Sequence, residues 1–160
     1  PYCFLMNTDF DKFPPELVEK YMKRSLAYGM FPGFFSHNAS SGHYFTRPNL
    51  YDRDRPLFKK YVPLCKLVAE AGWEPVTHAR SSDDRVYVER FGGGSHDQPN
   101  SPRWLTVFND SPERRTVTIT LEGESPQSSR ELAGGQTLAW KNGKTTLTLD
   151  GEDVTVLELR

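Results

Sequence analysis

Two short apolar runs, with one amphipathic segment between them, constrain the fold of this chain more than any other feature of its sequence. The runs are Tyr2–Met6 and Met30–Phe35; both are too short for helices and lack polar alternation. Such runs are typical of parallel strands covered on both faces. Between them, Pro14 and Pro15 open a helical pattern with apolar residues at i, i+4 spacing, and Gly29 closes it. We therefore predict a right-handed βαβ unit with parallel strands.

A second amphipathic helix is predicted from about Pro56 to Gly72, after a long polar loop, with a kink or restart at Pro63. Two strands alone cannot make a stable parallel sheet that is covered on both faces. Residues 1–80 are therefore expected to need further strands. An upstream segment, another chain or other copies of this chain are the possible sources.

The amino-acid composition changes at about Asp83, from rich in aromatic residues to rich in Thr, Ser and Gly. Asn142-Gly143 lies between two apolar-alternating runs, which is a strong hairpin signal. Turn signals recur about every ten residues, and this spacing predicts an antiparallel β-sandwich. The expected strands are Val86–Phe91, Trp104–Asn109, Arg115–Leu121, Gln136–Lys141, Lys144–Leu149 and Val154–Leu159.

Composition excludes several classes of function. The 160 residues carry a formal net charge of -1, so neither a nucleic-acid footprint nor a membrane-surface patch is expected. No apolar run approaches the ~18–20 residues of a membrane span. Cys3 and Cys65 lack a metal-ligand spacing and are expected to be buried free thiols. The chain begins at Pro1 inside an apolar run, as a processed chain would, and an extracytoplasmic or secreted location is slightly favoured.

The order of these elements resembles the C-terminal portion of a TIM-barrel glycoside hydrolase with an appended β-sandwich. The segment YCFLMNTDF is similar to a seventh barrel strand and its loop, YGMFPGFFSHNAS to the eighth strand, and RDRPLFKKYVPLCKLVAEAGWEP to the last helix. The segments RVYVERFG, WLTVFNDS and DVTVLELR resemble parts of the sandwiches that finish many glycosidase chains. The resemblance implies an α/β plus all-β chain, with the last two βα units of a (β/α)8 barrel in residues 1–80 and an accessory sandwich in residues 84–160.

The same resemblance implies hydrolysis of an O-glycosidic bond in an oligo- or polysaccharide, between two carboxyl groups. The chain alone is expected to be inactive, because the acid/base group of the earlier strands is absent. No cofactor is expected, since the glycines at 92–94 lack a downstream phosphate-binding pattern. The expected partners are the carbohydrate substrate and the remaining barrel strands.

Polar side chains follow both predicted parallel strands, at the strand ends where α/β enzymes keep their ligand sites. Asp9 is the candidate catalytic carboxylate; contact with substrate, or capping of the following helix, is the alternative. Many retaining barrel glycosidases have a Glu at the end of strand seven, and this chain has none there. Asn7 is a candidate substrate contact, and Asp11 is the expected helix cap.

The loop after the second strand supplies the other candidate substrate contacts. His37 and Asn38 carry imidazole and amide groups that hydrogen-bond sugar hydroxyls. His43 and Tyr44 follow in the same loop. The ring of Tyr44 or Phe45 is expected either to stack on a sugar or to pack against other aromatic residues of the loop. His37 and His43 have no third ligand in view, so no metal site is predicted.

Two other functions stay open at this stage. The first is a non-catalytic carbohydrate-binding or structural β-sandwich module, which a solvent-exposed Trp104 or Trp140 in a groove would favour. The second is a different barrel enzyme, because this fold hosts many chemistries. Trp73, at the end of the second helix, is expected to pack between the two parts of the chain.

Overall fold

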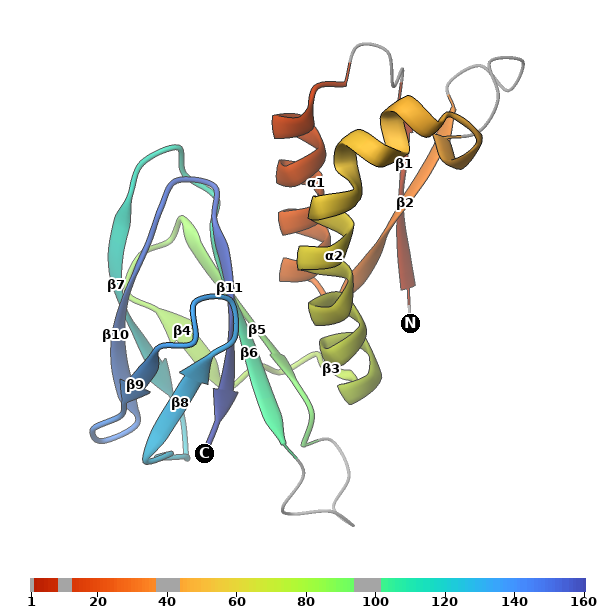
Figure 1. Cartoon of the computed structure of the whole chain (residues 1–160). Coiled ribbons are helices and arrows are strands. Elements are labelled where there is room, and N and C mark those ends of the chain that lie inside the picture. Colours follow the sequence, from red (N-terminus) through yellow and green to blue (C-terminus); the bar gives the residue numbers. More distant parts are fainter. Residues whose placement is uncertain (1, 9–12, 37–43, 94–101) are drawn as a thin grey trace.

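The computed structural model describes residues 2–8, 13–36, 44–93 and 102–160 (Figure 1). Its N-terminal part holds the parallel strands β1 (Tyr2–Thr8) and β2 (Met30–Ser36), joined by helix α1 (Pro15–Ala27). A short 3-10 turn, Tyr44–Thr46, and helix α2 (Pro48–Ala71) follow. The other strands form two sheets in the second half of the chain.

Strands β1 and β2 pair in parallel without a break, from Tyr2 opposite Met30 to Thr8 opposite Ser36. This confirms the predicted parallel pair with a single helical connection. Tyr21 of α1 fastens the helix to both strands, because its hydroxyl donates to the carbonyl of Phe4 and accepts a 3.0 Å hydrogen bond from the Gly33 N–H. Within the described residues this sheet has two strands only.

Helix α2 differs from its prediction at its start and at its prolines. It begins at Pro48 rather than Pro56 and runs through Pro56 and Pro63 without interruption. An interior proline removes one backbone hydrogen bond, but the buried face of the helix holds it in place. That face includes Leu50, Asp54, Tyr61, Cys65 and Val68.

The two sheets of the second half are antiparallel throughout, as predicted. The three-stranded sheet has the order β10-β7-β4, and the six-stranded sheet the order β3-β5-β6-β11-β8-β9. Apolar side chains from both sheets meet in one core, so the two sheets form a sandwich. The strands are β3 (Trp73–Glu74), β4 (Ala79–Ser81), β5 (Val86–Phe91), β6 (Arg103–Asn109), β7 (Arg115–Leu121), β8 (Ser128–Glu131), β9 (Thr137–Ala139), β10 (Lys144–Leu149) and β11 (Val154–Leu159).

The turn at Asn142-Gly143 forms as predicted, with φ values of 52° and 70°. The hairpin it opens is short, however, because only Lys141 and Lys144 pair across it. Beyond that pair, β9 joins β8 in the six-stranded sheet, and β10 joins β7 in the other. The turn therefore connects the two sheets.

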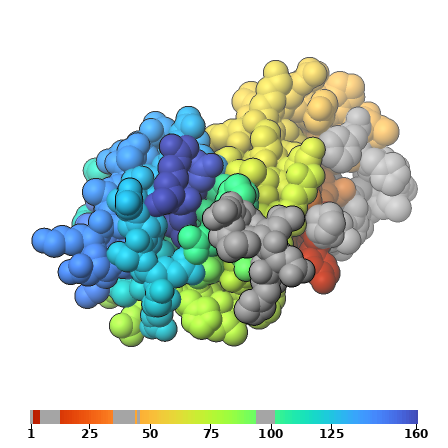
Figure 2. All heavy atoms as spheres, turned by 90° about the horizontal axis from the view of Figure 1, so that it is seen from below, coloured from red at the N-terminus to blue at the C-terminus, as the bar shows by residue number. Residues whose placement is uncertain are grey.

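The outer face of the six-stranded sheet packs against α1 and α2, so the two parts of the chain lie side by side (Figures 1 and 2). Val156 of β11 and Val18 of α1 are fully buried in this contact, together with Val68 of α2. Ion pairs border it: Lys23 lies 2.9 Å from Asp153, and Arg24 2.8 Å from Asp110. The first strands of the sandwich, β3 and β4, precede residue 84, the predicted start of the sandwich.

The exposed face of β1 is the main departure from the expected burial. Cys65 is buried on α2, but Cys3 is exposed, so its predicted burial is wrong in this structure. Tyr2 is 80% and Phe4 40% exposed. Side chains alternate along a strand, so Cys3 lies on one side of the sheet, and Tyr2 and Phe4 lie on the other, where the Phe4 ring also contacts Tyr21 of α1 at a centroid distance of 5.3 Å. No helix in the described part of the chain is long and apolar enough to cross a membrane.

Candidate functional site

The carboxyl ends of β1 and β2 meet at one edge, because the strands are parallel and Thr8 lies opposite Ser36. Both segments predicted to carry the site leave the sheet at this edge. Asp9, His37, Asn38 and His43 themselves lie outside the described residues, and their roles stay predictions. The backbone of Asn7 pairs opposite Phe35, one residue before the end of β1; its side chain is outside the description.

Tyr44 is the predicted site residue whose side chain the structure describes. It is fully buried, and its ring stacks on Phe34 at a centroid distance of 4.8 Å and an interplanar angle of 18°. Its hydroxyl donates a 2.8 Å hydrogen bond to Oδ2 of Asp54. One face of the ring is thus occupied by Phe34, and the contact with a sugar stays a prediction.

Asp54 is the centre of a small buried cluster at this edge, and its side chain is inaccessible to solvent. The neighbouring Arg53 donates to both carboxylate oxygens, from Nε at 2.7 Å and from Nη2 at 2.9 Å. The same Nη2 donates to the carbonyl of Phe13 at 3.0 Å. Phe13 precedes α1 and Tyr44 follows β2, so Arg53 and Asp54 link the segments that leave the two strands.

The protonation states of Tyr44 and Arg53 are fixed at neutral pH. Burial, and secondly the hydrogen bond to Asp54, raise the pKa of Tyr44 far above its ordinary value. The hydrogen bond to Asp54 raises the pKa of the Arg53 guanidinium. A neutral phenol and a permanent cation are better suited to holding loops in place than to transferring a proton. Within the described residues, no group of three His, Cys, Asp or Glu side chains could hold a metal ion.

Sequence reasoning missed Arg53 and Asp54, because the charged run at residues 52–55 reads as the end of a loop. A signal was present nonetheless. Leu50, Asp54 and Tyr61 fall on one face of a helix at i, i+4 and i+11, and all three are buried. A carboxylate on an otherwise apolar stripe predicts a buried, paired acid.

The three tryptophans occupy different environments. Trp140 is 7% exposed, and its Nε1 donates a 2.9 Å hydrogen bond to Ser129 inside the sandwich. Trp104 packs, partly buried, at the contact between sheet and helices. Trp73 is 56% exposed, and its Nε1 donates to Glu89 at 2.7 Å. Its predicted packing between the two parts is therefore only partial, because β3 is the edge strand of its sheet.

Comparison with known proteins gives structural matches alone. No protein family matches the sequence, and no curated protein does so. Solved glycoside hydrolases match nearly the whole chain. An α-amylase from Anoxybacillus is 17% identical, with 99% of this chain and 38% of that chain covered and a TM-score of 0.59. A GH30 endoxylanase from Clostridium papyrosolvens is 16% identical, with 98% and 41% covered and a TM-score of 0.55.

A putative α-N-acetylgalactosaminidase from Bacillus halodurans is 12% identical, with 92% of this chain and 31% of that chain covered and a TM-score of 0.52. The chain therefore shares its fold with parts of these solved glycoside hydrolases. It spans about two fifths or less of the length of these structures. At such identities the likeness concerns the fold alone.

Proposed function

We propose that this chain is the C-terminal part of a glycoside hydrolase that cleaves O-glycosidic bonds in an oligo- or polysaccharide. The observation that carries the proposal is the extent of the structural match. It covers 99% of this chain in the α-amylase and 98% in the endoxylanase, so the βα part and the antiparallel sheets match together.

In this proposal, residues 1–80 are the last two βα units of a (β/α)8 barrel, and residues 84–160 are an accessory sandwich. A two-stranded parallel sheet is not stable alone, and the exposed Tyr2 and Phe4 are the apolar surface that neighbouring barrel elements would cover. An upstream segment, another chain or other copies would supply those elements.

The proposed chemistry sits at the carboxyl ends of β1 and β2. Asp9 acts there as one of the two carboxyl groups that a glycosidase needs. Asn7, His37, Asn38 and His43 contact the sugar, whereas Tyr44, which is fully buried and bonded to Asp54, supports this edge from within. Arg53 and Asp54 link Phe13 and Tyr44, the first described residues after the two loops, which supports the proposal because catalytic geometry tolerates little movement.

Native mass spectrometry of the purified protein tests the assembly first. A partner of roughly 200–300 residues, the remainder of a typical barrel, supports the proposal. Assemblies built from 18.3 kDa copies alone leave only other copies as the source of the strands. A folded monomer that stays alone contradicts the barrel.

Activity on chromogenic glycosides tests the site in the assembled enzyme. The Asp9→Asn variant is expected to lose at least about a hundredfold in kcat, as the loss of a catalytic carboxyl group does. Asp11→Asn is the matched control and is expected to retain kcat, because no substrate contact is proposed for Asp11; the predicted cap role of Asp11 is not seen either, since the N-cap of α1 is Pro14 and has no side-chain cap hydrogen bond. Equal activity of Asp9→Asn and the unaltered enzyme would remove Asp9 from the mechanism.

The alternative function, a carbohydrate-binding or structural sandwich module, has less support. A binding platform in the sandwich would need an exposed Trp104 or Trp140. The first is partly buried against the helices and the second lies in the sandwich core.

A further inference from the structure

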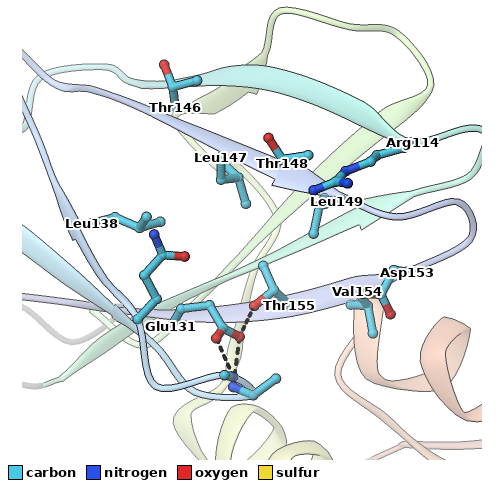
Figure 3. Close-up of a pocket in the computed structure, with 13 residues that line it drawn as sticks. Arg114, Glu131, Leu138, Thr146, Leu147, Thr148, Leu149, Asp153, Val154 and Thr155 are labelled. Atoms are coloured by element: carbon cyan, nitrogen blue, oxygen red, sulfur yellow. Dashed lines mark hydrogen bonds between the residues drawn. The ribbon is translucent and has the colours of Figure 1, made fainter.

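The surface hollows of the described residues are of two kinds, polar and aromatic. One polar hollow, of about 500 Å³, lies between β10 and β11 (Figure 3). None of the described residues that line it is aromatic. Its carboxylate, Glu131, already accepts hydrogen bonds from the Ala133 N–H and the Thr155 hydroxyl. No feature of this hollow selects one kind of occupant.

Two aromatic hollows, of about 350 and 530 Å³, adjoin each other and share Tyr28 and Met30 in their linings. Tyr2 and Trp73 line the larger hollow, and Phe4 lines the smaller one. These three side chains are exposed, and so is Tyr28. A group of exposed aromatic rings around adjoining hollows is typical of a surface that another polypeptide segment covers.

The aromatic hollows continue the contact between the sandwich and the helices. Phe91 lines the larger hollow and Phe108 the smaller one, and both rings are buried in that contact. The smaller hollow is lined by Phe4 of β1 and by Phe108 of β6, so it lies in the layer between the parallel strands and the sandwich, which α1 occupies (Figure 1). From the same layer, the ring of Tyr21 lies 5.3 Å from that of Phe4. A segment that filled the hollows would therefore extend an existing interface.

Both aromatic hollows lie at the amino ends of the parallel strands, because Tyr2 begins β1 and Met30 begins β2. In the successive right-handed βα units of a barrel, every crossover helix lies on the same face of the strands. A helix that leads into β1 would therefore lie on the face that α1 covers. Such a helix runs antiparallel to the strands, so its last turn reaches the amino end of β1, beside the hollows.

We propose that the two aromatic hollows receive the last turn of the helix that precedes β1 in the complete barrel, with apolar side chains of that turn against the four exposed rings. This inference rests on the proposed function, which requires further barrel elements beside β1. Its new element is the role of the sandwich. Through Phe108 of β6 and Trp73 of β3, the sandwich contacts the rest of the barrel directly, in addition to its contact with α1 and α2.

The charge of Arg24 favours the carboxyl end of a helix at this place. Its guanidinium borders the smaller hollow, and its Nη2 donates to Asp110 at 2.8 Å. The last turn of a helix presents carbonyl groups without intrahelical partners, together with a partial negative charge. A guanidinium has further N–H donors for such carbonyls. The amino end of a helix, with its free N–H groups, would be disfavoured beside this cation.

Hydroxyl-radical footprinting of the assembled protein tests whether the hollows are covered. Tyr28 and Tyr87 are 41% and 44% exposed in this chain, but only Tyr28 lines the hollows. Radical oxidation does not require an ionised phenol, so the pKa of Tyr28, which burial and secondly Glu89 raise, does not bias the comparison. Tyr28 should be oxidised at least about tenfold more slowly than Tyr87. Equal rates in an assembled barrel would overturn this inference and leave the proposed function standing.

Photo-crosslinking identifies the occupant. In the Tyr28→p-benzoylphenylalanine variant of the assembled protein, the cross-link should fall in about the last two turns of the helix that precedes β1. The same replacement at Tyr87 is the matched control and should give no such cross-link.

A cross-link from position 28 to any other segment, such as the sandwich of a second copy, overturns the inference. Protection of Tyr28 that appears only when maltohexaose or xylohexaose is added also overturns it, because a sugar would then fill the hollows. A purified protein that stays an isolated 18.3 kDa monomer would instead contradict the barrel on which the inference rests.

Discussion

Gly29 lies directly against the ring of Phe91, and through this contact the turn between α1 and β2 packs against the six-stranded sheet. Gly29 has a φ of +64°, and a Cβ atom at this position would overlap the Phe91 ring. Phe91 is 1% exposed and cannot move aside into solvent. The glycine that follows the C-cap of the first helix is thus also the residue that lets the two parts of the chain approach.

The Gly29→Ala variant is expected to lose roughly 2–4 kcal/mol of stability, from the positive φ and from overpacking against a buried ring. Urea denaturation measures the loss. Gly123→Ala is the matched control, with a φ of +75° and no atom within 4 Å of the added Cβ. It should cost only about 1 kcal/mol. Equal losses in the two variants would mean that Phe91 does not constrain Gly29.

The cluster around Asp54 predicts an unequal effect of two nearby substitutions. Asp54→Asn removes the charge that faces Arg53 in a buried site, and should cost about 2–3 kcal/mol. Asp52→Asn is the control: its side chain is 65% exposed, and its ion pair with Arg55 is 4.0 Å long. It should cost less than about 0.5 kcal/mol. Thermal or urea unfolding of both variants shows whether the buried carboxylate of Asp54 stabilises the fold more than the exposed carboxylate of Asp52.

Glu19 should make the stability of the chain sensitive to acid. Burial by itself acts to raise the pKa of Glu19, but hydrogen bonds from Tyr61 and Lys60 hold it below its ordinary value of 4.5. A carboxylate with a lowered pKa stabilises the fold above its unfolded pKa, and this contribution is lost as the pH falls through the folded pKa. Stability should therefore decline as the pH falls below 4.5.

Tyr61→Phe tests this dependence, because the Tyr61 hydroxyl donates to Oε1 of Glu19 at 2.6 Å. Without that hydrogen bond, burial dominates and the pKa of Glu19 rises toward its ordinary value or above it. The unfolding free energy of the variant, measured from about pH 3 to about pH 7, should fall less steeply in the acid range. Tyr87→Phe is the control, since Tyr87 is 44% exposed. Parallel curves for the variant and the original would exclude Glu19 as the source.

The sequence predicted those strands whose side chains alternate between core and solvent. Arg115–Leu121 was expected with the bounds that the structure has, because apolar residues and threonines alternate along it. The strand Ser128–Glu131 was missed, since only Ser129 is buried and its pairing with β11 holds it in the sheet. No apolar period marks such a strand, and its existence depends on a neighbour 28 residues later in the chain.

The candidate site, too, could be predicted from the sequence only in part. That polar residues follow two parallel strands could be read from the order of the elements, and the register of β1 and β2 agrees with it. The cluster of Tyr44, Arg53 and Asp54 could not be read this way, because it depends on where α2 starts. The sequence pattern indicates a helix start at Pro56, whereas Pro48 lies at the first turn and is the proline that opens the helix.

The two cysteines provide a test of both the fold and the proposed assembly. Burial raises the pKa of the Cys65 thiol to about 12, whereas Cys3 is exposed on β1. A thiol reagent should therefore modify one cysteine per isolated chain quickly, and the second only on unfolding. Cys3→Ser should abolish the fast reaction.

In the proposed complete barrel, neighbouring strands cover β1, and the fast reaction of Cys3 should slow by at least about tenfold. Fast modification of both thiols would contradict the buried face of α2, and an unchanged rate for Cys3 in an assembly would show that its partner does not cover β1.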